Sequence, residues 1–190
     1  ERTIAYTQDR ATWRDHAPGP LRHTGNPLDI AVTGDGYFTV NSPRGPRLTR
    51  DGRFSMLADG TLTDNAGNSV LDGNGRPIQF STRDTRIAIA GDGTISSENG
   101  QLGKIGIVRP TNPMLLTAEG DTMLDSKSPT EPVTAPGVVQ GAVEDSNVQP
   151  VLELTRMLNE QRQFEFVAKF VEAESERQRE AIDKIVTPQR

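Results

Sequence analysis

The chain has 190 residues, 33% of them hydrophobic and 25% charged, and its formal net charge at pH 7 is -5. This charge excludes a general binder of nucleic acid or of anionic membranes, because no face-sized excess of Lys and Arg is available to neutralise phosphates. The chain contains no cysteine, which excludes disulfides, thiolate metal sites and cysteine nucleophiles.

Residues 1–26 sustain neither a helical nor an alternating pattern, and Pro18-Gly19-Pro20 stands in this segment. We expect an extended lead-in. The first six residues lack the basic and apolar regions of a secretory signal, and no run of about 18 apolar residues follows that could form a transmembrane helix. Because the chain does not begin with methionine, we also expect it to be a processed or truncated fragment.

Residues 27–143 are predicted to form a β-rich body. The alternating runs 28–32 and 37–40 enclose Gly34-Asp35-Gly36, a pattern typical of a β-hairpin. Turns such as Asp51-Gly52 and Asp59-Gly60 carry the residue types that supply positive φ angles. Further strand-like runs lie at 47–49, 53–57, 61–63, 69–71, 77–80, 86–90, 94–96, 102–108, 114–116 and 138–143, and residues 131–141 are predicted to be a connector.

Many short strands without an intervening helical pattern favour a mainly β fold. We predict an all-β body of short antiparallel strands, sandwich-like or barrel-like, and not a parallel sheet with crossover helices.

The segment 144–190 differs from the body because it contains no glycine. Pro150 and Glu153 are typical of a first helical turn. Residues then recur at alternating steps of three and four, which predicts a long C-terminal helix with a heptad seam. The seam positions are Leu154, Met157, Gln161, Phe164, Ala168, Val171, Ser175, Gln178, Ile182 and Ile185. Such a helix would be about 55 Å long, so we expect it to reach a partner rather than lie on the body.

The aromatic residues of the tail favour packing of helix on helix over a ligand site. Phe164 lies on the seam, and we expect Phe170 to lie beside it, near Val171. The polar seam positions either specify partner and register, as buried polar residues do in coiled coils, or are solvated.

Two acidic turns have fragments of a calcium-loop pattern. They are Asp72-Gly73-Asn74-Gly75 and Asp92-Gly93, but Arg76 stands where a third calcium ligand would be needed. Asp-Gly and Asn-Gly are common hairpin turns, and we interpret both segments as turns.

Other candidate sites are weaker. Gly34-Asp35-Gly36 lacks the third glycine of a phosphate-binding loop. The two histidines, His16 and His23, both stand in the lead-in and would need carboxylates from elsewhere to bind a metal. The 26 acidic residues always offer carboxylate pairs in space, so glycoside chemistry stays open on sequence alone. We therefore predict no catalytic, cofactor or metal site.

Several stretches together resemble the flagellar rod and hook proteins. They are residues 26–40, 48–54, 59–62, 144–148 and 160–165. The motif residues are Asn26, Pro27, Leu28, Asp29, Gly34, Gly36, Arg50, Gly52, Phe54, Ser146, Asn147, Gln161 and Arg162. Residues 18–25 and 73–78, with a short central β region, favour the proximal-rod type, and the distal-rod type is the alternative.

The resemblance implies a non-enzymatic structural subunit that polymerises into the basal-body rod, the drive shaft that transmits motor torque to the hook. It implies export by the flagellar type III apparatus and a place in the periplasmic rod. The implied partners are further copies and rod proteins of the FlgB, FlgC and FlgG types, with no nucleic acid and no membrane insertion. It further implies that residues 144–190 form the C-terminal helix of an inner coiled-coil layer, where it pairs with an N-terminal helix of the same chain.

That N-terminal helix does not stand in this sequence, which supports the expectation of a fragment. Two alternatives stay open on the residues alone: a β-domain adaptor that recruits a partner through its helix, and a carbohydrate-active enzyme on a β scaffold. The second rests on analogy of fold only.

Overall fold

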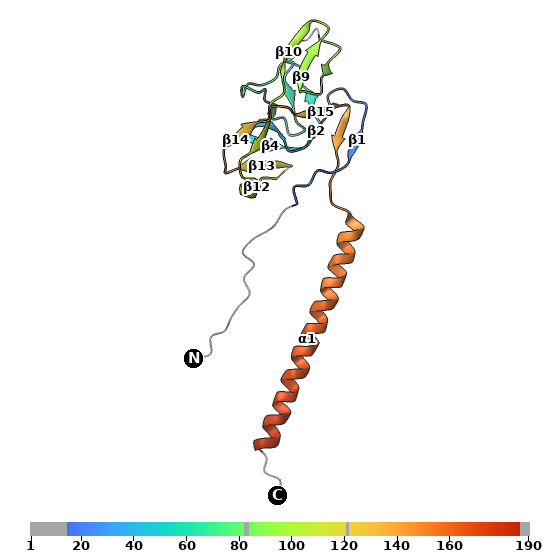
Figure 1. Ribbon diagram of the computed structural model, residues 1–190, viewed down its shortest axis with the longest axis vertical. Helices are drawn as coiled ribbons and strands as arrows, with labels where there is room; N and C mark the ends of the chain where they lie inside the picture. The colour runs from blue at the N-terminus through green and yellow to red at the C-terminus, as the bar shows by residue number, and fades with distance from the viewer. Residues whose placement is uncertain (1–14, 82–83, 121, 187–190) are drawn as a thin grey trace. The chain divides into compact units, whose positions relative to one another are not determined.

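The computed structural model describes residues 15–81, 84–120 and 122–186, with side chains up to residue 183. The chain divides into two compact units, residues 1–147 and residues 148–190. The first unit holds the short strands and the second holds the long helix (Figure 1).

The first unit contains β1 (Leu21–His23), β2 (Ile30–Thr33), β3 (Tyr37–Ser42), β4 (Gly45–Thr49), β5 (Ser55–Met56), β6 (Leu62–Thr63), β7 (Ser69–Val70), β8 (Ala88–Ile89), β9 (Thr94–Ser97), β10 (Gly100–Lys104), β11 (Ile107–Pro110), the 3-10 helix η1 (Pro113–Leu115), β12 (Leu116–Ala118), β13 (Met123–Ser126), β14 (Thr130–Pro132), β15 (Gly137–Gln140) and β16 (Ala142–Glu144). The second unit contains α1 (Pro150–Val186), one uninterrupted helix of 37 residues.

Every pairing between the described strands is antiparallel. The largest sheet has the order β12-β13-β4-β3-β7-β6-β5, and β11 joins it by pairing with β3 and β14. Three smaller sheets are β10-β9-β8, β15-β2 and β1-β16. None of these sheets closes into a barrel within the described ranges. The prediction of a mainly β fold with a long C-terminal helix is therefore confirmed, in an open form.

The core of the body follows from alternation along the strands. In β3, Phe38, Val40 and Ser42 are buried while the residues between them are more exposed, as the two-residue period of a strand requires. The ring of Phe38 meets that of Phe54 edge to face, with centroids 5.1 Å apart. Strands of several sheets contribute to this one cluster, which includes Ile30, Leu62, Ile95 and Ile105.

Several predicted strands have different limits in the structure. The run 102–108 divides into β10 and β11, because the backbone of Gly106 lies against the carbonyl oxygens of Leu71 and Asp72, where a Cβ would be 2.8 and 2.6 Å away. The run 77–80 makes only isolated bridges, at Pro77 and Gln79. Proline has no amide to donate to a ladder, which limits pairing there.

The region after residue 110 differs most from the prediction. The run 114–116 is divided between η1 and β12, since the side chain of Asn112 accepts a hydrogen bond from the amide of Met114 at 3.0 Å and caps the 3-10 turn. The predicted connector 131–141 contains β14 and β15, and the predicted strand 138–143 divides at Gly141, whose φ is 73°. β1 and β13 were not predicted.

Candidate functional site

Arg50 directly follows β4 and connects three parts of the body. Its guanidinium group donates to the carbonyl oxygen of Gly34 at 2.7 Å, to that of Gly36, and from Nε to Oε2 of Glu144 at 2.9 Å. It also lies over the ring of Tyr37, 5.5 Å from the centroid. The side chains of Arg50 and Glu144 are only 21% and 11% exposed. Arg50 therefore fixes the β2–β3 turn to the end of β16.

Two motif glycines allow close approaches that no other residue would. A Cβ on Gly52 would stand 1.6 Å from the carbonyl oxygen of Ile30, whose own amide donates to the carbonyl of Gly52 at 2.9 Å. A Cβ on Gly36 would stand 2.7 Å from the side chain of Ile107. Gly34 has a φ of 85°, and the predicted turn at Gly34-Asp35-Gly36 is confirmed. The predicted hairpin is wrong, because the strands on either side of the turn do not pair with each other: β2 pairs with β15, and β3 pairs with β4, β7 and β11.

The motif Asn26-Pro27-Leu28-Asp29 forms the turn that leads into β2. The carboxamide of Asn26 accepts from the amide of Leu28 at 3.2 Å and donates to Asp29 at 3.0 Å. The amide of Asp29 donates to the carbonyl of Asn26 at 3.0 Å, and Asp29 is buried. This is the local side-chain capping expected of Asn in a turn.

The described end of the lead-in runs antiparallel to the segment that precedes α1. Leu21 pairs with Glu144 in the β1–β16 register, and the amide of Asp145 donates to the carbonyl of Pro20 at 2.9 Å. The amide of Gly19 donates to Oε1 of Glu144, also at 2.9 Å. A Cβ on Gly19 would lie 1.8 Å from the carbonyl oxygen of Asp145. These contacts hold two distant parts of the sequence side by side.

Asn147 completes this pairing at the last residue of the first unit. Its side-chain amide donates to the carbonyl of Ala17 at 2.9 Å. Arg22 adds a bidentate ion pair with Asp145, at 2.9 and 3.3 Å, on a more exposed surface. The chain thus enters the body near Ala17 and leaves it near Asn147 at the same place.

Beside this pairing lies a cleft of about 640 Å³, lined by the lead-in, the β12–β13 loop and residues 144–147. Its ionisable groups are largely paired with one another, as Arg50 with Glu144. Burial raises the pKa of Tyr37, and the neighbouring Arg50 offsets only part of that effect. A phenol that holds its proton more tightly is a weaker acid, and Arg50 and Glu144 beside it are engaged with each other.

The two turns with calcium-loop fragments use their carboxylates within the turn. Oδ1 of Asp72 accepts from the amides of Asn74 and Arg76, both at 2.8 Å. Asp92 accepts from the amide and the hydroxyl of Thr94, which hold its pKa below the ordinary value. Both segments are turns, as predicted. Among the residues that the structure describes, no group of three or more His, Asp or Glu side chains is placed to hold a metal ion.

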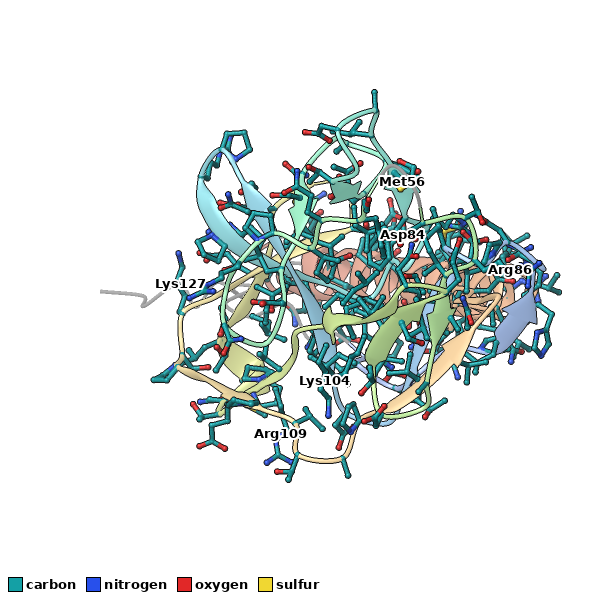
Figure 2. All side chains as sticks on the ribbon, turned by 90° about the horizontal axis from the view of Figure 1, so that it is seen from above. Met56, Asp84, Arg86, Lys104, Arg109 and Lys127 are labelled. Carbon is teal, nitrogen blue, oxygen red and sulfur yellow. The ribbon has the colours of Figure 1, made fainter. Side chains whose placement is uncertain are left out.

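Several cationic side chains of the body lie on different sides of it. Figure 2 shows Arg86, Arg109 and Lys127 spread around the body rather than in one patch. Arg109 is 3.9 Å from Glu131, and Lys127 pairs with Asp125.

The helix α1 exposes its seam. The large apolar seam side chains that the structure describes are more than half exposed, from Leu154 at 53% to Phe164 at 74%. Gln161, a polar seam residue and a motif residue, donates to Glu165 at 3.2 Å. Arg162 and Ser146 are exposed, and the side chain of Ile185 lies outside the described residues. Within the described chain, no helix has the length together with the apolar character needed to cross a membrane.

One expectation about the helix is wrong. At 100° per residue, Phe170 does not lie beside the seam but on the far side of the helix, together with Phe166 and Ala173. Phe166 and Phe170 are 72% and 64% exposed. The helix therefore has a second, shorter apolar patch opposite the seam.

The sequence identified most of the residues that meet at the end of β16, but not their contacts. It did not predict that Arg50 binds Glu144 and covers Tyr37, or that Gly19 binds Glu144. The one available signal was that Glu144 lies in a motif stretch, directly before Asp145. The pairing with Gly19 depends on tertiary contact over 125 residues and has no local signal.

Comparison with known proteins places these features in context. The family described as "Flagellar hook protein FlgE/F/G D1 domain" matches residues 31–97, and "Flagellar basal body rod FlgEFG protein C-terminal" matches residues 139–184. The first match contains Arg50, Gly52 and Phe54, and the second contains Asn147 and the seam up to Ile182.

Among curated proteins, the chain is similar to the flagellar basal-body rod protein FlgF of Caulobacter vibrioides, 35% identical over 184 residues, which are 96% of this chain and 75% of that protein. It is 36% identical to FlgF of Mesorhizobium japonicum over 185 residues, 96% of this chain and 77% of that protein. The rod protein FlgG of Bacillus subtilis is 30% identical over 177 residues, 85% of this chain and 66% of that protein.

Proposed function

The chain belongs to the FlgE/F/G family of flagellar rod and hook proteins and is a structural, non-enzymatic subunit of the flagellar basal-body rod; from this premise we propose that the exposed seam of α1 is the surface through which the subunit assembles. The observation that carries the proposal is a heptad seam whose large, described apolar side chains are more than half exposed on a long helix. An isolated helix gains little stability from its own surface, so such a seam favours a packed partner.

In this role, residues 144–190 form the C-terminal helix of an inner coiled-coil layer, and the β-rich body of residues 27–143 lies outside that layer, after the lead-in of residues 1–26. The contacts of Asn147 and Glu144 with the lead-in support it, because they hold the start of the helix segment to a defined point on the body. The subunit then contributes to the shaft that transmits torque to the hook, with other rod proteins of the FlgB, FlgC and FlgG types as neighbours and the flagellar type III apparatus as its exporter.

Within the rod, we assign the chain to the FlgF position. The FlgF relatives are 35–36% identical over 96% of the chain, whereas FlgG of Bacillus subtilis is 30% identical over 85% of it. We expect the natural protein to restore swimming to a strain that lacks its own FlgF and not to one that lacks FlgG. Restoration of the FlgG-deficient strain alone would reverse the assignment.

The seam is tested by Phe164→Asp and Val171→Asp, made together in the natural protein. Two buried carboxylates in a helix-helix contact are strongly unfavourable, so we expect loss of swimming and of the protein from purified basal bodies. The control is Gln163→Asp, which changes helix propensity one residue away from the seam. Motility with both seam substitutions in place would show that the seam is not the assembly surface.

A further inference from the structure

The charges on α1 are sorted relative to the seam. In heptad terms, the positions that flank the seam on its two sides carry Glu153, Glu160, Glu165, Glu172 and Glu174, with Arg179 as the single cation. Five acids and one base give these flanks a net charge of -4. The flanks of the seam are therefore strongly acidic.

The helix does not lack basic residues; they stand elsewhere. Arg156, Arg162, Lys169 and Arg177 all occupy positions away from the seam flanks. Two of them neutralise a flanking acid from outside, Arg156 with Glu153 at 2.8 Å and Arg177 with Glu174 at 3.2 Å. The flanks are therefore acidic because the basic residues of the helix lie at other positions, and not because the helix lacks basic residues.

The remaining flanking acids have weaker partners. Glu165 accepts an amide hydrogen bond from the seam residue Gln161 at 3.2 Å, and Glu160 and Glu172 have no ion pair with any side chain that the structure describes. These three carboxylates stand along the middle of the seam, where a partner helix would place its own flanking residues.

A second copy of this helix gains no charge complementarity at the seam. In a parallel pair, a flanking residue meets the residue five positions further along the partner, which places Glu160 of one helix against Glu165 of the other and Glu174 against Arg179. The like-charge and opposite-charge contacts of a parallel pair therefore balance. An antiparallel pair is unfavourable, since both of its flanks carry mostly glutamate and like charges select against a partner.

From this pattern we propose that the seam of α1 accepts an amphipathic helix whose own flanking positions are basic, in preference to a second copy of itself. The proposal rests on the assignment of the seam as an assembly surface and names the chemistry of its partner. Lys or Arg at the facing positions would pair with Glu160, Glu165 and Glu172 across the contact.

The test uses the full chain and three synthetic helical probes. The first two probes share one apolar seam and differ only at the flanking positions, which are all Lys in one probe and all Glu in the other. The third probe is a copy of residues 150–186. Exposed ion pairs each change an affinity about twofold or threefold, so several together predict on the order of tenfold tighter binding of the Lys-flanked probe. This preference should shrink at about 1 M salt, where charges are screened beyond about 3 Å. The copy of residues 150–186 should bind more weakly than the Lys-flanked probe.

A matched pair of variants separates position from net charge. Glu160→Lys with Glu172→Lys brings the flanks from -4 to 0, and Glu176→Lys with Glu180→Lys makes the same change of charge away from them. We expect the first variant to lose the preference for the Lys-flanked probe and the second to keep it. Equal binding of the Lys- and Glu-flanked probes to the unmodified chain, or equal loss in both variants, would overturn the proposal.

The result is distinguishable from a failure of the proposed function. If Phe164→Asp with Val171→Asp removes the protein from basal bodies while the probes bind equally, the seam is the assembly surface and only its charge selectivity is wrong. If the seam substitutions leave assembly intact, the proposed function fails whatever the probes do.

Discussion

Replacement of Arg50 with methionine removes the contact on which the motif residues of the body converge. The side chain makes three hydrogen bonds, two to carbonyl oxygens of the β2–β3 turn and one to Glu144, and it covers the ring of Tyr37. Hydrogen bonds to charged groups contribute about 1.5–3 kcal/mol each when one partner is truncated. Removing one partner of a buried pair costs about 3–5 kcal/mol.

The costs of the three hydrogen bonds do not add in full here, because Arg50 is partly exposed and Glu144 keeps the amide of Gly19 as a donor. We therefore expect a loss of about 3 kcal/mol in the free energy of unfolding of the body. Urea titration followed by pulse proteolysis measures this loss without a contribution from the signal of the helix. In a double-mutant cycle with Glu144→Gln, the coupling should be about 1.5 kcal/mol.

Arg53→Met is the matched control. Arg53 is 44% exposed, and its carboxylate partners, Asp51 and Asp145, are 3.5 and 3.8 Å away. Exposed pairs of this kind contribute about 0.5 kcal/mol. A loss below about 1 kcal/mol for Arg50→Met, or an equal loss for Arg53→Met, would refute the reasoning that burial and geometry make Arg50 the stabilising contact.

Three further predictions concern the body. Gly52→Ala should cost more than about 3 kcal/mol, since the new Cβ would stand 1.6 Å from a carbonyl oxygen, whereas Gly73→Ala, with open space around it, should stay within about 0.5 kcal/mol in the same urea assay. Hydrogen bonds from Thr85 lower the pKa of Glu98 from 4.5 to about 2, so its stabilising effect is present above pH 4.5 and is lost as the pH falls toward 2. Glu98→Gln should flatten the acid limb of the unfolding profile in that window, and an unchanged limb would contradict the assignment. Thr39→Val removes a buried hydroxyl that has no partner among the described residues and should stabilise by about 1 kcal/mol, seen as a rise in Tm.

The elements that were predictable from sequence are those with a local signal. The turn at Gly34-Asp35-Gly36 and the helix from Pro150 have residue types that determine backbone geometry within a few positions. The partners of the strands on either side of that turn were not predictable in this way, because β2 pairs with β15 and β3 with β4, β7 and β11. β13 had no such signal, because its side chains are only partly buried and do not alternate. β1 is exposed throughout and is held by its pairing with β16, more than a hundred residues away.

The candidate site shows the same division. Gly52 and Arg50 stood out because they belong to the motif, but the sequence did not show what each one does. Gly52 is needed because it lies against the carbonyl oxygen of Ile30, and Arg50 because it binds Glu144; both partners are brought close only by the tertiary fold. The error at Phe170 had another cause. Phe170 directly precedes the seam residue Val171 in sequence, but it lies about 100° from Val171 and about 200° from Ala168 around the helix axis, so nearness in sequence misleads on a helix.

The motif residues of the body and the seam residues of the helix form two groups that should behave differently in the isolated chain. Those of the body, such as Arg50 and Gly52, are packed or paired, so their replacement lowers the stability of the single chain. A seam residue such as Phe164 is 74% exposed, and its replacement removes no buried contact within that chain. Loss of assembly without loss of stability is therefore the mark of the seam, whereas loss of both together marks the contacts that hold the start of the helix segment to the body. A substitution that abolishes motility identifies an assembly surface only after the stability of the chain has been measured.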